Sequence, residues 1–403
     1  MTDVSELSEA TGADAGGGPL VRRMREFGTT VFATMTKLAV DTGSINLGQG
    51  FPDTDGPERM LERAVEAVRG GLNQYPPGPG LPELRQAVSD HRKQWYGLAY
   101  DPDGEVLVTV GATEAISAAV LALCEPGDEV VLFEPYYDSY AAAVSLAGAV
   151  RRPVTLRVDA GRFTFDPAEL EAAIGPRTRA ILVNSPHNPT GTVFTREELE
   201  AVARVCRERD LIAITDEVYE HLTFDGVEHI PLATLPGMRE RTVMISSAGK
   251  TFSVTGWKTG WVCGPAPLVA AVQAVKQFLT FTSSAPWQTA VAYALREEME
   301  WVARQRAALE AKRDRLVAGL EEAGFGVLRP AGTYFVQTDI RPLGFEDGLD
   351  LAGRLPGLAG VVAIPTQVFY DRPSRGRAYV RFAFCKRDEV IDEAAARLRA
   401  LRG

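Results

Sequence analysis

The chain has 403 residues, of which 45% are hydrophobic and 24% charged, and its formal net charge is −10. This length predicts two domains. The acidic balance argues against a nucleic-acid partner and against a polybasic membrane anchor, because both need a basic face. The four cysteines include no CxxC pair and indicate reduced thiols in a cytoplasmic protein, and the four histidines include no HExxH pair, so no metal site is expected.

The N-terminal residues 1–21 are small, polar and rich in glycine. They lack the basic and apolar regions of a signal peptide, so we expect a mobile tail. No later stretch is apolar and long enough to span a bilayer. The next segment, 22–60, is expected to join a smaller domain formed mainly by the end of the chain.

Between residues 61 and 290, short apolar runs alternate with helical patterns. The runs are apolar throughout, which predicts buried strands of a mostly parallel sheet with helices on both faces. A capping box of Thr195 and Glu198 predicts the start of one helix. The segment therefore reads as a large α/β domain, with strands expected at 106–110, 129–135, 179–186, 211–217, 242–247 and 260–264.

From residue 291 to residue 403 the pattern changes. A charged helical run covers 297–320, and a second helix is predicted over 388–401. Between them lie strand candidates rich in β-branched and aromatic residues. This order predicts a smaller α+β domain, with strands expected at 332–340, 360–365 and 378–384.

Ligands of an open α/β sheet bind at the carboxyl ends of its strands. Five predicted strand ends carry small, aromatic, hydrogen-bonding or ionisable residues, which favours one converging site. The helix start at Gly111 offers backbone amides to a phosphate. Lys250 is a scarce lysine in a glycine-rich turn, although a single loop lysine is usually only solvated. The five ends carry Gly111 to Thr113, Pro135 to Tyr137, Asn184 to Gly191, Asp216 to Tyr219, and Ser246 to Lys250.

Three of these segments resemble the motifs of class I/II aminotransferases, which are fold-type I enzymes dependent on pyridoxal 5'-phosphate (PLP). They are SSAGKTFSVTGWKTGW at 246–261, NSPHNPTG at 184–191 and DEVY at 216–219, and they occur in the expected order. The resemblance extends from residue 22 to residue 401. It implies a large domain with a mostly parallel seven-stranded sheet between helices, a smaller α+β domain, and PLP as cofactor.

The resemblance also implies roles for individual residues. Lys250 matches the Schiff-base lysine that moves a proton, and Asp216 matches the carboxylate that pairs with the pyridine nitrogen. Asn188 and Tyr219 match groups that bind the 3-oxygen of the cofactor, and Tyr219 is counted with Lys250 and Asp216 as catalytic. Tyr137 matches the aromatic residue stacked on the ring. The expected phosphate site consists of Gly111, Ala112, Thr113, Ser247 and Lys258, where many relatives have arginine in place of Lys258.

Other residues match the substrate site of the family. Arg381 matches the arginine that binds the α-carboxylate, although without the family it reads as a surface strand arginine. Gly50 and Asn188 are expected beside the substrate, and Phe32 and Phe281 match aromatic positions around the pocket that serve equally well as core residues. Tyr75 matches a tyrosine that reaches the phosphate of a neighbouring subunit, so the resemblance implies a homodimer with composite sites.

The segment NLGQGFPD at 46–53 resembles the branch of kynurenine, glutamine and methionine aminotransferases. That branch also contains the actinobacterial N-succinyldiaminopimelate aminotransferases, which NQYPPGPG at 73–80 and VRFAFCKRDE at 380–389 resemble most. We therefore predict transfer of an amino group from N-succinyl-LL-2,6-diaminopimelate to 2-oxoglutarate, in lysine biosynthesis. Methionine, glutamine or kynurenine transamination and a PLP-dependent C–S β-lyase remain alternatives. A PLP-fold regulator is disfavoured by the acidic charge and by the short segment before the fold.

Overall fold

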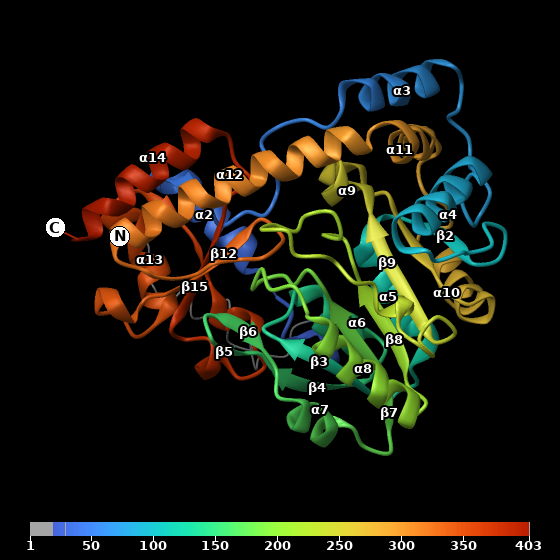
Figure 1. Cartoon of the computed structure of the whole chain (residues 1–403), viewed down its shortest axis with the longest axis horizontal. Coiled ribbons are helices and arrows are strands. Elements are labelled where there is room, and N and C mark those ends of the chain that lie inside the picture. Colours follow the sequence, from blue (N-terminus) through green and yellow to red (C-terminus); the bar gives the residue numbers. More distant parts are fainter. Residues whose placement is uncertain (1–18, 29, 403) are drawn as a thin grey trace.

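A computed structural model describes residues 19–28 and 30–402. Most of the expected tail at 1–21 therefore lies outside the described residues. Figure 1 shows a central sheet flanked by helices and a second part formed by the C-terminal segments, with the long helix α12 lying across the top of the view. Among the described residues, no helix combines the length and the apolar character needed to cross a membrane.

The larger part is built on a seven-stranded sheet with the order β2-β10-β9-β8-β7-β3-β4. The neighbours from β9 to β4 run parallel, whereas β10 is antiparallel to both β9 and β2. This confirms the predicted mostly parallel sheet. The strands are β2 (Val106–Thr109), β3 (Glu129–Glu134), β4 (Val150–Thr155), β7 (Thr178–Asn184), β8 (Ile212–Asp216), β9 (Thr242–Ser247) and β10 (Gly260–Cys263).

Six of the seven strands coincide with the predicted apolar runs, and β4 does not. Its sequence VRRPVT contains two arginines and a proline, so it lacks the continuous apolar run of a buried strand. It lies at the edge of the sheet, where β3 is its only strand partner among residues 19–28 and 30–402. An edge strand has one solvent-facing side, which tolerates charged side chains and needs no N–H from Pro153.

Helices cover both faces of the sheet, because neighbouring residues of a strand point to opposite sides. Leu132 of β3 packs with the helices of one face, whereas Val131 and Phe133 pack with those of the other. The first face carries α5 (Gly111–Leu123), α6 (Asp138–Leu146) and α10 (Ala266–Leu279). The second carries α7 (Pro167–Ala173), α8 (Arg196–Glu208), α3 (Glu58–Arg69), α4 (Pro82–Tyr96) and α11 (Ala285–Glu297).

The predicted capping box is confirmed at the start of α8. The Glu198 amide donates to Thr195 Oγ1 at 3.2 Å, and the Thr195 amide donates to Glu198 Oε2 at 2.7 Å. Both bonds use amides that have no partner inside the helix. Further short elements are β5 (Arg157–Asp159), β6 (Arg162–Thr164) and α9 (Ala248–Thr251), with 3-10 turns at Arg22–Met24, Leu232–Thr234, Thr255–Trp257, Arg341–Leu343, Thr366–Phe369, Pro373–Arg375 and Arg399–Arg402.

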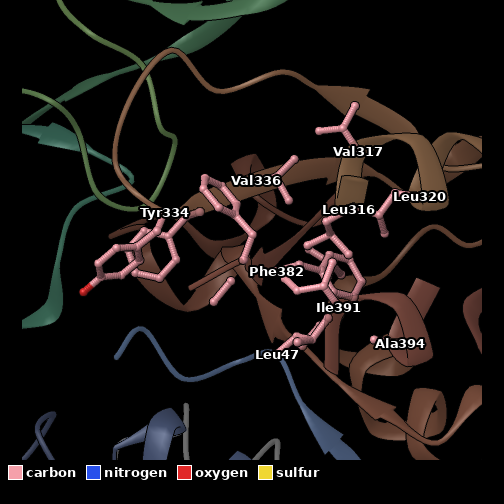
Figure 2. Close-up of a cluster of buried hydrophobic side chains, with 14 of the residues drawn as sticks. Leu47, Leu316, Val317, Leu320, Tyr334, Val336, Phe382, Ile391 and Ala394 are labelled. Carbon is pink, nitrogen blue, oxygen red and sulfur yellow. The ribbon is translucent and has the colours of Figure 1, made fainter. Parts of the chain in front are cut away.

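The smaller part contains a four-stranded antiparallel sheet with the order β11-β12-β15-β14. Its core joins Leu316 and Leu320 of α12 to Val336, Phe382 and Ile391 (Figure 2), and each such side chain contributes roughly 1.5–3 kcal/mol when fully buried. The expected strands and helices are present. They are β12 (Phe335–Asp339), β14 (Ile364–Pro365), β15 (Tyr379–Ala383), α12 (Met299–Ala323) and α14 (Asp388–Leu398). The structure adds β11 (Gly326–Leu328) and α13 (Gly348–Ala359), which were not predicted.

The N-terminal segment packs against this smaller part. Strand β1 (Ile45–Asn46) pairs in parallel with β13 (Val361–Val362), and Leu47 enters the core in Figure 2. Helix α2 (Val31–Thr42) adds a further apolar contact with α13 and β14. These contacts support the proposed assignment of 22–60 to the smaller domain. The predicted division at 290/291 falls inside α11, and we propose that it lies instead between α11 and α12.

Candidate active site

A cavity of about 330 Å³ is formed where the parallel strands end, and all five predicted strand ends contribute to its wall. Segments that are far apart in sequence therefore meet at one edge of the sheet, as the topology of an open α/β sheet requires. The predicted site residues in the wall are Phe32, Gly50, Gly111, Ala112, Thr113, Tyr137, Asn188, Asp216, Tyr219, Ser247, Lys250, Lys258 and Arg381.

One end of the cavity is cationic. Helix α5 begins at Gly111, whose positive φ of 75° suits glycine. A Cβ at Gly111 would lie 3.3 Å from Lys258 Nζ, and one at Gly260 would lie 2.7 Å from the Gly111 carbonyl carbon. The two glycines thus allow the helix start and Lys258 to approach closely. Free backbone amides and an ammonium group at one place suit a phosphate.

Asp216, at the end of β8, is buried beneath the cavity. Its Oδ2 accepts a hydrogen bond from Tyr140 Oη at 2.7 Å, and its Oδ1 accepts one from the Val218 amide at 3.3 Å. Asn184 Nδ2 donates to the Asp216 carbonyl oxygen at 2.8 Å. Burial raises the pKa of Asp216 to about 6. Within the described residues no cation forms an ion pair with this carboxylate, so it is available to a cationic group in the cavity.

Lys250 lies in the short helix α9, which directly follows β9. Its Nζ donates to Tyr334 Oη at 2.8 Å. Burial lowers the pKa of Lys250 to about 8, and the positive charges of Lys258 and Arg381 act in the same direction. A lysine with a lowered pKa exists partly as the neutral amine near pH 7, the form that attacks a carbonyl or accepts a proton.

Arg381, in β15, is 1% exposed and faces the cavity from the smaller part. Its Nη1 donates to Asn188 Oδ1 and its Nη2 donates to the Gly48 carbonyl oxygen, both at 3.0 Å. The ring of Phe335 lies 4.0 Å from the guanidinium carbon. Burial lowers the pKa of Arg381 to about 10. In the described part of the chain no carboxylate pairs with Arg381, so this buried cation is available to an anionic ligand.

Two further tyrosines are fixed at the wall of the cavity. Tyr137 packs edge-on against Tyr140, with ring centroids 5.8 Å apart, and burial raises its pKa to about 12. Tyr219 packs edge-on against Tyr334 at 5.2 Å, and burial raises its pKa above the ordinary value. Both tyrosines are therefore neutral hydrogen-bonding groups near pH 7.

Tyr75 and Phe281 do not reach the cavity of their own chain. Their rings meet edge-on, with centroids 5.3 Å apart, on the surface, where Tyr75 is 81% and Phe281 54% exposed. Phe281 follows the end of α10 and does not line the cavity of its own chain, so its place beside a substrate pocket stays a prediction. Any contact of these two residues with a site requires a second copy.

Residues at the site for which the sequence predicted no individual role include Tyr140, Asn184 and Tyr334. Tyr140 follows Tyr137 by three residues on α6, and this helical spacing was a usable signal because such residues share a face. Asn184 belongs to a recognised strand end. Tyr334 precedes a strand of the other domain, and only the packing of the two parts reveals its contact with Lys250.

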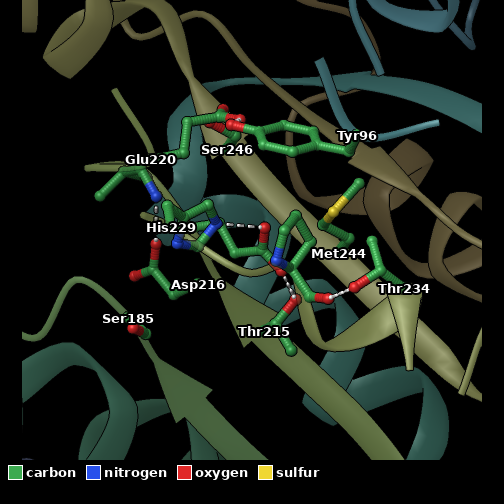
Figure 3. Close-up of polar contacts among 12 residues, drawn as sticks. Tyr96, Ser185, Thr215, Asp216, Glu220, His229, Thr234, Met244 and Ser246 are labelled. Atoms are coloured by element: carbon green, nitrogen blue, oxygen red, sulfur yellow. Dashed lines mark hydrogen bonds and ion pairs between the residues drawn. The ribbon is translucent and has the colours of Figure 1, made fainter. Parts of the chain in front are cut away.

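A second polar cluster lies outside the cavity, where His91, Glu220 and His221 bring potential metal ligands within 4.8 Å of one another. Each oxygen of Glu220 already accepts two hydrogen bonds: Oε1 from Arg92 and Ser246, and Oε2 from Arg92 and Tyr96. Figure 3 shows Tyr96 and Ser246 beside Glu220. Because its carboxylate is saturated by protein donors, we assign this cluster a structural role.

The family model of class I and II aminotransferases matches residues 42–398. The chain belongs to this family. It is 54% identical to the probable N-succinyldiaminopimelate aminotransferase DapC of Mycobacterium tuberculosis, over 94% of this chain and 98% of the relative. The structure of the M. tuberculosis N-succinyldiaminopimelate aminotransferase matches with a TM-score of 0.93 and covers 95% of this chain and 100% of that one. The methionine aminotransferase of Escherichia coli is 39% identical, over 94% of this chain and 97% of the relative.

Aminotransferases of this family use PLP, and the residues of the cavity fit this cofactor. The cationic end at Gly111 and Lys258 suits its phosphate. Asp216, buried without a cation partner, suits the protonated pyridine nitrogen, and Lys250 supplies an amine of lowered pKa for covalent attachment. When bound, PLP supplies an electron sink for the charge that develops at the substrate Cα. The protein is thus a PLP-dependent aminotransferase.

Proposed function

We propose that this aminotransferase moves the amino group of N-succinyl-LL-2,6-diaminopimelate to 2-oxoglutarate, a step of lysine biosynthesis. The observation that carries transamination of an α-amino acid is Arg381, a buried cation that faces the cavity and whose partners among the described residues are neutral acceptors. A substrate α-carboxylate would supply the missing charge in bidentate geometry. The choice of donor is supported by the relative at 54% identity, whose printed name gives that substrate.

The polar residues of the cavity wall have distinct proposed roles in the reaction. Arg381 and Asn188 hold the α-carboxylate, which places the substrate Cα near Lys250. The neutral Lys250 amine takes the proton from Cα and returns it later, acting as general base and then as general acid. When PLP is bound, Asp216 would hold the proton on its pyridine nitrogen, and Tyr219 together with Asn188 would donate to its 3-oxygen.

The remaining wall residues bind the cofactor and border the substrate. Tyr137 stacks on the cofactor ring, and Phe32 and Gly50 line the substrate side of the cavity. Gly50 allows the ring of Phe335 to pack against the backbone, because a Cβ at this position would lie 2.4 Å from Phe335 Cζ. The phosphate site consists of Gly111, Ala112, Thr113, Ser247 and Lys258.

We further propose a homodimer in which Tyr75 and Phe281 of one protomer complete the site of the other. Their exposure supports this, because two contacting aromatic residues on a surface are typical of an interface core. The proposed compartment is the cytoplasm. The cysteines of the described residues support it, since Cys124, Cys206, Cys263 and Cys385 are all buried free thiols.

The test is a panel of amino donors, each incubated with 2-oxoglutarate, with glutamate formation as the readout. We expect the highest kcat/KM with N-succinyl-LL-2,6-diaminopimelate. Lys250→Ala should abolish turnover, whereas Lys93→Ala, at an exposed lysine of α4, should retain it. Normal turnover by Lys250→Ala would refute the proposed mechanism, and equal rates with unrelated donors would refute the proposed substrate.

Methionine is the second candidate donor, with kynurenine and glutamine behind it. The rings of Phe32 and Phe335 line the cavity beside Arg381, and an apolar side chain packs well there. The Escherichia coli relative at 39% identity is named a methionine aminotransferase. A kcat/KM for methionine above that for the succinylated donor would favour this reading. Pyruvate release from cystathionine without any 2-oxo acid would instead show C–S β-lyase activity.

A further inference from the structure

Tyr334 lies directly behind the lysine of the proposed mechanism and is not part of the cavity wall. The side chain is 1% exposed, just before β12 in the smaller part. Its hydroxyl oxygen lies 2.8 Å from Lys250 Nζ and 2.6 Å from the Gly50 carbonyl oxygen. The hydroxyl thus bridges a residue of the large domain and the N-terminal segment.

The chemistry of the three groups sets the direction of both hydrogen bonds. A carbonyl oxygen only accepts, so the single hydroxyl hydrogen of Tyr334 is directed to Gly50. The Tyr334 oxygen can then only accept from Lys250, which must donate an N–H. One N–H of the amine is therefore fixed toward Tyr334, which restricts the directions open to its lone pair.

Gly50 is held in this contact by close packing. A Cβ at Gly50 would lie 2.4 Å from Phe335 Cζ and 3.3 Å from Tyr334 Cε2, so only glycine brings its carbonyl to this place. Two residues earlier, the Gly48 carbonyl oxygen accepts from Arg381 Nη2 at 3.0 Å. The short segment 48–50 is therefore bonded to Arg381 at one end and, through Tyr334, to Lys250 at the other.

We propose that Tyr334 is a positioning residue that orients the Lys250 amine for proton transfer and links its orientation to segment 48–50, which also contacts Arg381. This inference rests on the proposed role of Lys250. A substrate carboxylate that binds Arg381 acts on one end of the segment, and the lysine is held from the other. The link makes proton transfer sensitive to occupation of the carboxylate site.

The first test is Tyr334→Phe, which keeps the ring contacts with Tyr219 and Phe335 and removes only the hydroxyl. We expect kcat to fall about ten- to a hundredfold, since misplacement of a catalytic group has effects of this size. The KM for the donor should change less than about twofold, and the kinetic isotope effect with a Cα-deuterated donor should increase because proton transfer becomes slower.

The matched control is Tyr96→Phe, which removes another largely buried tyrosine hydroxyl, bonded to Glu220 outside the cavity at 2.7 Å. This variant should keep the wild-type kcat and isotope effect. A purely structural role of Tyr334 predicts equal behaviour of the two variants after correction for folded protein. Wild-type kcat and an unchanged isotope effect in Tyr334→Phe would overturn the proposal.

The second test needs no turnover. In full-length enzyme freed of cofactor, the pH dependence of Lys250 acetylation by acetic anhydride is followed by peptide mass spectrometry. Loss of the Tyr334 oxygen removes the only hydrogen-bond acceptor of the ammonium form found among the described residues. The midpoint should therefore move to lower pH by about one unit in Tyr334→Phe. An unmoved midpoint would contradict the proposed contact.

The two proposals fail in different ways. If Lys250→Ala retains turnover, the proposed mechanism is wrong whatever Tyr334→Phe does. If Lys250→Ala is inactive while Tyr334→Phe matches wild type in kcat, isotope effect and acetylation midpoint, only the positioning role is wrong.

Discussion

Arg92 and Arg381 are both fully buried, the first on α4 in the structural cluster with Glu220 and the second at the cavity. Arg92 donates to both oxygens of Glu220 at 2.6 and 2.5 Å. Although burial lowers the pKa of Arg92, the charge of Glu220 outweighs this and raises it overall. Arg381 donates to the neutral oxygens of Asn188 and Gly48, its only such partners in the described part of the chain, and burial lowers its pKa to about 10.

We call the Arg92–Glu220 ion pair a completed contact, because both charges are paired. Arg381 is an open contact, because its charge has no such partner in the described residues. Burial is almost equal at the two sites, and each arginine has an Nε without a partner. The two arginines differ in their counter-charge: Arg92 forms an ion pair with Glu220, whereas Arg381 has no carboxylate partner among the described residues. A buried cation without a carboxylate destabilises the folded chain, so its presence indicates a site for an anionic ligand.

The largest expected effect comes from Arg92→Met. It leaves Glu220 buried without its cation, so the free energy of unfolding should fall by about 3–5 kcal/mol, measured by urea denaturation. Adding Glu220→Gln should restore part of the loss. A fall below about 1 kcal/mol would show that Arg92 and Glu220 do not form the completed contact described above.

Arg381→Met should have the opposite pattern. We expect kcat/KM to fall about a hundred- to a thousandfold, because an α-carboxylate loses its charged partner. The midpoint of thermal unfolding should stay the same or rise, since an uncompensated buried charge is removed. Arg204→Met, at a half-exposed arginine of α8, is the control and should leave kcat/KM unchanged. A large fall in the midpoint of thermal unfolding of Arg381→Met would show that Arg381, like Arg92, stabilises the fold.

Asp216 extends the comparison to a buried anion. Its pKa is raised by burial to about 6, so the folded protein binds the proton more tightly than the unfolded chain. In cofactor-free enzyme the free energy of unfolding should therefore fall as pH rises from about 4 to about 6. Asp216→Asn should remove a fall on the order of 1–3 kcal/mol, measured by urea denaturation at several pH values. If the free energy of unfolding changes with pH in the same way in both proteins, Asp216 is not a buried carboxylate of raised pKa.

The smallest expected effect concerns Tyr140, whose hydroxyl is the neutral donor to Asp216 Oδ2. Tyr140→Phe should raise the pKa of Asp216 further and weaken PLP binding about tenfold, as loss of one hydrogen bond to a charged group predicts. The change is measured by absorbance titration of the cofactor-free enzyme. Tyr100→Phe is the control, because the buried Tyr100 hydroxyl has no hydrogen-bond partner within the described residues. Equal affinities in both variants would remove Tyr140 from the site.

Most of the large sheet could be predicted because buried parallel strands are apolar along their whole length. Strand β4 could not, because at the sheet edge Arg151, Arg152 and Pro153 are tolerated and the apolar signal is lost. The small strands β13 and β14 were predicted as one strand over 360–365. The residue types do not show that β13 pairs with β1 whereas β14 pairs with β15.

For the site, sequence reasoning reached the residues that follow strand ends and those that match family motifs. Tyr334 escaped it because its role depends on how the smaller part packs on the large sheet, a contact between Lys250 and a residue 84 positions later. The role of Phe281 stays a prediction, because this residue is exposed in a single chain and its contact with a pocket depends on a second copy.

The antiparallel direction of β10 has a consequence for the order of folding. Gly260 starts β10 opposite Ser247, the last residue of β9, so the turn between them brings Ser247, Lys250 and Lys258 to one edge within a single hairpin. Closing so short a loop is fast, whereas Arg381 must arrive from the C-terminal end of the chain. We expect the cofactor half of the cavity to gain protection in pulsed hydrogen exchange before the carboxylate-binding half does.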